Sequence, residues 1–136
     1  MTWKPTTVAA VAGATLTFAL AGASASTMHS SLGARLSGMG EHGIVNLQAT
    51  ASSGKLCWTF DVPTLKGATR ATIHTGPNGT VLLELGMHYT KTGCAKESMM
   101  TLEHLESKPG AYSVWVDTKA HPGEVRGTLF AGTAHM

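Results

Sequence analysis

Short runs of alternating apolar and polar residues, separated by turn residues, characterise the chain from about residue 32 onward. The clearest run spans residues 55–62, where Leu56, Trp58 and Phe60 alternate with polar side chains. Alternation with a period of two is typical of a β-strand with one buried and one solvated face. Other runs compatible with strands lie at residues 34–36, 44–50, 69–75, 80–85, 112–118 and 124–130.

Seven short strands separated by frequent turns predict an all-β domain, either an antiparallel sandwich or a barrel. The Gly-Pro-Asn-Gly sequence at residues 76–79 is a strong turn signal and joins two of these strands in a predicted hairpin. The strand that follows this turn is expected to have one apolar face formed by Val81, Leu83 and Leu85. We predict that the core of the domain contains Leu56, Trp58, Phe60, Val114 and Val116.

One segment departs from the strand pattern. Apolar residues recur at every third position from Met99 to Leu105, and Ser98 in front of them is a suitable helix cap. The sequence therefore predicts one short helix over residues 98–106, whereas residues 86–96 are predicted to be irregular.

The first 25 residues have the features of a cleavable secretory signal peptide. Lys4 supplies one positive charge, an apolar and small-residue run covers residues 6–21, and Ala23 and Ala25 are the small residues before the expected cut. Gly, Ala and Thr dilute the run, which falls short of the roughly 20 strongly apolar residues of a membrane-spanning helix. We expect cleavage after Ala25, an extracellular or periplasmic location, and no membrane span in the mature protein.

The remaining residues suffice for one domain. We expect a flexible N-terminal segment at 26–31, a β domain at 32–131 and a C-terminal tail at 132–136. Losing Lys4 from the ten basic residues leaves nine against eight acidic ones, and these charges are scattered singly. Without a basic stripe or an acidic run, the chain lacks the signature of a nucleic-acid-binding protein.

Cys57 and Cys94 are the two cysteines of the chain. In an oxidising compartment an even number of cysteines predicts a disulfide, and their spacing is far from the C-x-x-C of a redox pair. Closing this loop stabilises the fold by about 4 kcal/mol in the chain-entropy description, so a structural role is expected.

Several motifs make the chain resemble the CHRD (chordin-type) domain family, as a small exported member of the bacterial type. The most specific is Val116-Asp117-Thr118 followed by the sequence His-Pro-Gly-Glu-Val-Arg-Gly-Thr-Leu from residue 121 to residue 129. Weaker matches lie at residues 36–38, 54–58 and 71–76, and the similarity spans about residues 32–131. The resemblance implies an immunoglobulin-like or superoxide-dismutase-like β fold, and it implies no general biochemical activity.

The family usually has His-x-His where this chain has Thr72-Ile73-His74. It usually has Val-His-Thr where this chain has Val116-Asp117-Thr118. Of the family's three histidines, this chain therefore retains only His74. The charged and histidine residues of the two best motifs are His74, Asp117, His121, Glu124 and Arg126. We favour a structural network, in which the planar fork of Arg126 binds Asp117 or Glu124 and His74 meets a backbone carbonyl. The alternative is a copper or zinc site formed by His74, Asp117 and His121.

Methionine and histidine also occur as adjacent pairs, at residues 28–29, 87–88 and 135–136, and thioether and imidazole ligands together suit copper. If the signal is cut after Ser26 instead, His29 becomes the third residue of the mature chain. The terminal amine, two amides and the His29 imidazole would then offer Cu(II) a square-planar site.

No G-x-S-x-G, H-E-x-x-H or reactive cysteine motif is present. We therefore expect an exported, non-catalytic module without a cofactor, which binds an extracellular protein or a surface polymer. The alternative function is a metal-binding or redox-related exported protein that uses copper or zinc.

Overall fold

A computed structural model describes residues 30–136. The expected signal peptide at 1–25, most of the expected flexible segment and the conditional copper ligand His29 lie outside the described residues. In the part of the chain that the structure describes, no helix is long and apolar enough to cross a bilayer.

The described residues form nine strands, one α-helix and two short 3-10 helices, so the predicted all-β class with one short helix is confirmed. In chain order they are β1 (Ser30–Gly38), β2 (Glu41–Thr50), η3 (Ala51–Ser53), β3 (Lys55–Asp61), β4 (Ala68–Thr75), β5 (Val81–Glu84), β6 (Thr92–Lys96), α3 (Met99–Ser107), η4 (Pro109–Ala111), β7 (Tyr112–Thr118), β8 (Val125–Thr128) and β9 (Phe130–Ala131).

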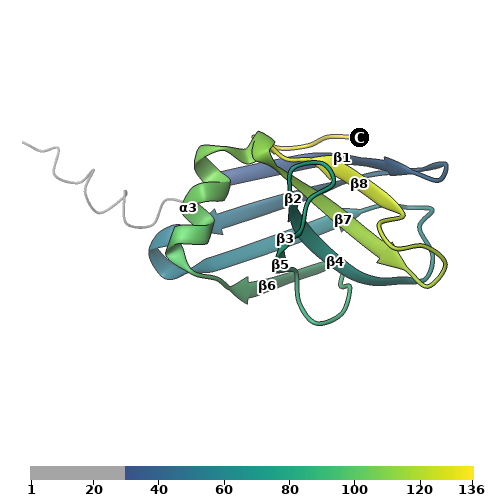
Figure 1. Cartoon of the computed structure of the whole chain (residues 1–136), viewed down its shortest axis with the longest axis horizontal. Helices are drawn as coiled ribbons and strands as arrows, with labels where there is room; N and C mark the ends of the chain where they lie inside the picture. The colour runs from purple at the N-terminus through teal and green to yellow at the C-terminus, as the bar shows by residue number, and fades with distance from the viewer. Residues whose placement is uncertain (1–29) are drawn as a thin grey trace, which may run out of the picture.

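The strands form one curled antiparallel sheet with the order β5-β4-β7-β8-β1-β2-β3-β6, and β9 pairs with β1. Figure 1 shows β7 and β8 crossing in front of β1, β2 and β3, so the two halves of the sheet face each other. The apolar side chains of both halves fill the space between them, so the core lies on the inner side of one sheet curled into a half-barrel.

The two open edges of the sheet are linked by residues 85–91. Leu85 and Tyr89 donate backbone hydrogen bonds to β4, at 2.9 and 3.0 Å, and the carbonyl of Lys91 accepts one from Phe60 of β3 at 2.7 Å. The chain then pairs with β3 as β6. Our expectation that residues 86–96 are irregular is therefore wrong for 92–96, because pairing with β3 makes a strand of a segment with little alternation of its own.

The predicted core is confirmed, since Leu56, Trp58, Phe60, Val114 and Val116 are all buried. Val81 departs from the expected apolar face: it is 45% exposed, whereas Leu83 and Leu85 are buried. The pairing of β4 with β5 shifts register between Ile73 and His74 and sets Val81 opposite His74, whose side chain lies on the outer face. A β-bulge of this kind moves the following side chains to the other face of the sheet.

The predicted helix is confirmed as α3, which begins one residue later than expected. Ser98 caps it, because its hydroxyl oxygen accepts a hydrogen bond from the backbone N–H of Thr101 at 3.1 Å. Leu102 and Leu105 are fully buried, so α3 packs over one end of the sheet (Figure 1).

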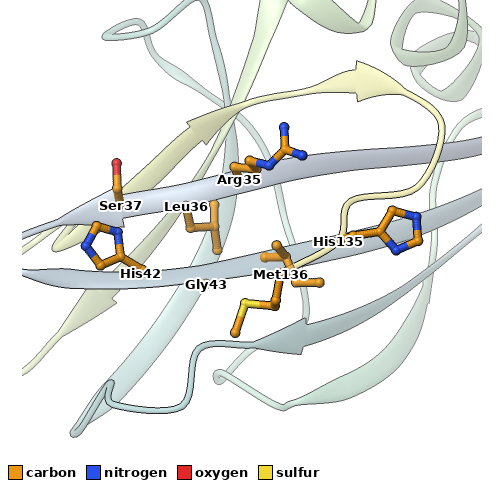
Figure 2. A pocket seen from close by; sticks show the side chains of 8 residues that line it. Arg35, Leu36, Ser37, His42, Gly43, His135 and Met136 are labelled. Carbon is orange, nitrogen blue, oxygen red and sulfur yellow. The ribbon is translucent and has the colours of Figure 1, made fainter.

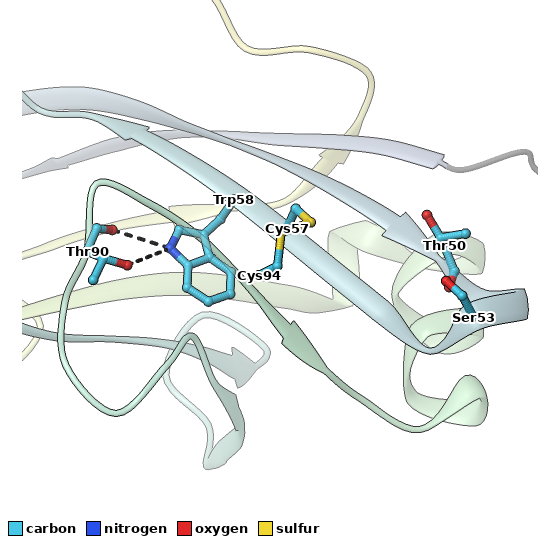
Figure 3. The surroundings of a disulfide bond; sticks show 6 residues. All are labelled: Thr50, Ser53, Cys57, Trp58, Thr90 and Cys94. Atoms are coloured by element: carbon cyan, nitrogen blue, oxygen red, sulfur yellow. Dashed lines mark hydrogen bonds between the residues drawn. A yellow bond between two sulfur atoms is a disulfide. The ribbon is translucent and has the colours of Figure 1, made fainter.

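The predicted disulfide between Cys57 and Cys94 is present and joins β3 to the edge strand β6 (Figure 3). The two residues pair directly in the register of these strands, on the outer face of the sheet. Next to it, the indole N–H of Trp58 donates to the carbonyl and hydroxyl oxygens of Thr90, both at 3.3 Å. The disulfide and this contact hold the crossing segment against β3.

Candidate functional site

The motif at residues 116–129 forms the end of β7, the loop to β8 and β8 itself. This loop lies at the end of the sheet opposite to α3, beside the turn between β1 and β2 (Figure 1). Backbone contacts fix this neighbourhood, because a Cβ atom at Gly38 of that turn would collide with the carbonyl oxygen of Glu124. The best-matched motif therefore shapes one end of the domain.

Short hydrogen bonds hold the β7–β8 loop in place. The carboxylate of Asp117 accepts from the backbone N–H of Gly123 at 2.6 Å. The Thr118 hydroxyl donates to the carboxylate of Glu124 at 2.7 Å and accepts from the backbone N–H of His121 at 3.0 Å. Gly123 has a φ of +60°, and a side chain there would meet the Trp115 ring. Both carboxylates thus bind groups of the loop itself.

Three side chains from neighbouring strands stack on the outer face of the sheet. The His74 and Trp115 rings are parallel to within 9°, with centroids 3.7 Å apart. The guanidinium carbon of Arg126 lies 3.7 Å from the centre of the Trp115 ring, which is cation–π geometry. Trp115 is not among the candidate site residues that the sequence motifs indicate; the signal for it is its position between the inward-facing Val114 and Val116, which directs its ring outward.

Both ring nitrogens of His74 are occupied by hydrogen bonds. Nδ1 lies 2.9 Å from the carbonyl oxygen of Gly79, and Nε2 lies 2.9 Å from the hydroxyl of Thr72. Because a carbonyl can only accept, Nδ1 donates to Gly79, and Nε2 shares a hydrogen bond with the hydroxyl of Thr72. The ring is buried, with 8% of the residue exposed. Its contact with a backbone carbonyl is the one that we expected.

Arg126 does not make the ion pair that we predicted. Its Nε donates to the carbonyl of Gly123 at 3.2 Å, and its Nη1 donates to the side-chain oxygen of Asn78 at 2.9 Å. Across the described residues, ion pairs within 4 Å join Arg70 to Glu84 and to Asp117.

The register of the sheet explains this difference. Arg126 pairs across the sheet with Trp115, whereas Asp117 pairs with Arg70, whose Nε lies 3.6 Å from its carboxylate. The ring beside Arg126 attracts the guanidinium, and the carboxylate of Asp117 is already bound by Arg70 and the loop. The prediction was wrong about the partner of Arg126.

The expected copper or zinc ligands His74, Asp117 and His121 do not form a common site. Within residues 30–136, no group of three or more His, Cys, Asp or Glu side chains is placed to hold a metal ion. His74 lies under the β4–β5 turn, whereas His121 is exposed on the β7–β8 loop.

Two open grooves flank the β7–β8 loop and share Pro122. The first, which we call the hairpin groove, has a volume of about 400 Å³ and separates the loop from the β1–β2 turn. Its lining includes Ser37, Met39, His121, Pro122, Glu124 and Arg126. The second, which we call the β4–β7 groove, has a volume of about 490 Å³, and its lining includes Arg70, Met87, His88, Asp117, Lys119 and Pro122.

A third groove lies over β1 and β2 beside the C-terminal residues. Asn46 anchors these residues, since its side chain exchanges two hydrogen bonds with the backbone of Ala134, at 2.7 and 3.1 Å. Figure 2 shows the His42 and His135 rings at opposite ends of this groove, with Met136 between them. The two imidazoles therefore do not converge on one point.

Two described groups have shifted pKa values, and both lie outside the motif. Burial, and secondarily the charge of Asp61, raises the pKa of Tyr89 in the crossing segment. Partial burial raises the pKa of Glu97, which precedes α3. Neither shift creates an acid–base pair at the β7–β8 loop.

Comparison with known proteins gives one family. The family profile described as CHRD domain matches residues 16–129, which is most of the chain. No curated protein sequence matches.

Proposed function

The chain belongs to the CHRD domain family, and we propose that it is an exported, non-catalytic binding module. Its partner in this proposal is an extracellular protein or a surface polymer, which contacts the β7–β8 loop and the two grooves beside it. The observation that carries the proposal is a loop held in a fixed shape by its own hydrogen bonds, between two open grooves. A preorganised loop loses little conformational freedom on binding.

The engagement of the polar groups of the motif supports a binding role over catalysis. The carboxylates of Asp117 and Glu124 accept hydrogen bonds from the loop, and both nitrogens of His74 are bonded. A general acid or base needs an atom that can reach a substrate. The side chains that reach the grooves without such bonds include Met39 and His121, which offer contact surface.

The location is supported by two features. The N-terminal residues have the pattern of a secretory signal, and the disulfide lies on the outer face of the domain at Cys57 and the exposed Cys94. Disulfides of this kind persist in oxidising compartments. N-terminal sequencing of the protein recovered from the medium or periplasm should read from Ser26 or a neighbour, and intact Met1 in soluble cytoplasm would contradict export.

Binding is tested with the purified protein on a panel of isolated cell-surface polysaccharides and secreted proteins from the producing cells. A variant of the loop, His121→Ala, should weaken binding at least tenfold. The matched control is His104→Ala, an exposed histidine on α3 at the other end of the domain. Binding that survives His121→Ala and is lost with His104→Ala would place the interface at the wrong end and overturn the proposal.

A further inference from the structure

The methionines of the described residues all lie on the surface. Their exposed fractions range from 52% for Met99 to 83% for Met87, and the other three are Met39, Met100 and Met136. Methionine is normally a flexible filler of hydrophobic cores. Placing every described thioether in solvent leaves the sulfur atoms accessible to a ligand.

Met39 has the least ordinary position of the five. It lies at the tip of the turn between β1 and β2 with a φ of +52°, and among residues 30–136 no other residue except glycine has a positive φ. Left-handed backbone is rare for a long side chain, and Gly38 and Gly40 flank it with positive φ values of their own. A glycine at position 39 would suit the turn better, so the turn itself does not explain the methionine.

His121 lies on the other side of the hairpin groove, which both residues line. Its backbone is fixed by Thr118, which bonds both the N–H and the carbonyl of His121. Its imidazole makes no hydrogen bond or ion pair with any described residue. The collision that a Cβ at Gly38 would make with Glu124 shows how closely the turn and the loop approach. A fixed loop therefore presents a free imidazole to the same groove as an exposed thioether.

We propose that the Met39 sulfur and the His121 imidazole bind a soft monovalent cation, Cu(I), across the hairpin groove. Thioethers select Cu(I), and imidazole is a good ligand for copper. Both ligands are neutral, so the bound ion keeps its single positive charge and no change of oxidation state is involved. This site lies in one of the two grooves that the proposed partner contacts and shares His121 with that surface, and it does not use His74 or Asp117, which are bonded elsewhere.

The rest of the surface provides internal comparisons. Met87 is adjacent to His88 in the β4–β7 groove. Its methyl signal therefore tests whether a methionine next to a histidine in the sequence is enough to bind the cation. Met99 is exposed on α3. The residues three and four positions after it are Leu102 and Glu103, so Met99 has no imidazole neighbour on its face of the helix. His42 follows the same turn as Met39 but lines the third groove, so it is a competing imidazole that is close to Met39 in the sequence.

The test is a titration of the purified, disulfide-intact protein with Ag(I), which has the charge and softness of Cu(I) without its redox chemistry. Proton–carbon NMR of methyl-labelled methionine reports each thioether separately. The first equivalent of Ag(I) should shift the Met39 methyl signal, and His121→Ala should weaken this binding at least tenfold. Met39→Gly, which suits the left-handed turn, should remove one equivalent of binding. Met99→Ser and His42→Ala should leave the affinity at Met39 unchanged.

Three results would overturn the proposal. One is an equal shift of all exposed methionines, which indicates non-specific binding to any thioether. Another is an affinity at Met39 that His121→Ala leaves unchanged. The last is an effect of His42→Ala as large as the one expected for His121→Ala. Because partner binding is measured separately, with polysaccharides and proteins, failure of the cation site leaves the proposed function standing.

Discussion

Replacing Arg126 by Lys keeps the positive charge but removes the planar guanidinium that lies 3.7 Å from the centre of the Trp115 ring. That guanidinium also donates to the carbonyl of Gly123 and to the side chain of Asn78. A lysine ammonium is a single point charge and cannot make the stacking contact and both directed hydrogen bonds together. We therefore expect Arg126→Lys to destabilise the domain although the net charge is unchanged.

The size of the loss follows from these contacts. A cation over an aromatic ring at a partly exposed site contributes about 0.5–1 kcal/mol, and an ordinary hydrogen bond contributes about 0.5–1.5 kcal/mol. Lys retains part of the first and can form one of the bonds, so the free energy of unfolding should fall by about 1–2 kcal/mol. In a domain of this size that corresponds to a Tm lower by roughly 5–10 °C.

Equilibrium unfolding in urea of the disulfide-intact protein measures this change, and Arg35→Lys on the exposed face of β1 is the matched control. Double-mutant cycles identify the partner of the arginine. Arg126→Lys should couple to Trp115→Leu by at least about 0.5 kcal/mol and to Asp117→Asn by close to zero. Unchanged stability of Arg126→Lys, or a stronger coupling to Asp117 than to Trp115, would refute the stacking interpretation and restore the ion pair.

Other perturbations test the core, the disulfide and a carboxyl group. Phe60 is fully buried and contacts the Tyr89 ring at a centroid distance of 5.2 Å. Phe60→Ala should therefore lower the free energy of unfolding, measured in urea titrations, by about 3–5 kcal/mol. A loss below about 1 kcal/mol would contradict the burial of this side chain. Replacing both Cys57 and Cys94 by Ala should lower the free energy of unfolding by about 4 kcal/mol. A reductant should then have no further effect on the stability of the variant. A variant as stable as the oxidised wild type would show that the disulfide is dispensable. Partial burial raises the pKa of Glu97, so the folded state favours the protonated carboxyl. The stability that this group contributes at low pH is therefore lost as the pH rises through its pKa in the folded state. Glu97→Gln should therefore be more stable than the wild type at neutral pH and should lose that advantage below the pKa of a glutamate in the unfolded chain. Thermal melting from pH 7 to pH 3 measures this difference. A difference in stability that does not depend on pH would argue against a raised pKa of Glu97.

The parts of the fold that were predictable are those where one strand carries its own signal. Trp58 and Phe60 alternate with polar neighbours, and such alternation determines the buried face whichever strand lies beside it. The strand at 92–96 has no such signal, because its pairing with β3 and its disulfide define it. Val81 was misplaced for a related reason, since the bulge beside His74 is a property of two paired strands and not of either one alone.

The candidate site divides in the same way. The contact of His74 with a carbonyl was predictable, because the turn that provides the carbonyl of Gly79 follows directly in the sequence. The partners of Arg126 and Asp117 depend on how three strands align. A shift of two residues in that alignment would exchange Trp115 for Asp117 opposite Arg126. Register between distant strands is set by the whole sheet, so residue types alone could not choose between these partners.

The departures of this chain from the family's histidine pattern have local structural consequences. The hydroxyl of Thr72 shares a hydrogen bond with Nε2 of His74, and the carboxylate of Asp117 accepts one from the N–H of Gly123 while it faces Arg70. A histidine at position 117 would instead place an imidazole opposite a guanidinium, without the carboxylate that neutralises it. The residues that replace the histidines thus serve to fix a turn and a loop, and the sheet face between them is filled by the stacked Trp115 ring. Ligand contacts are therefore better sought at the loop and its two grooves, where side chains remain unengaged, than on the sheet face where the family has its histidines.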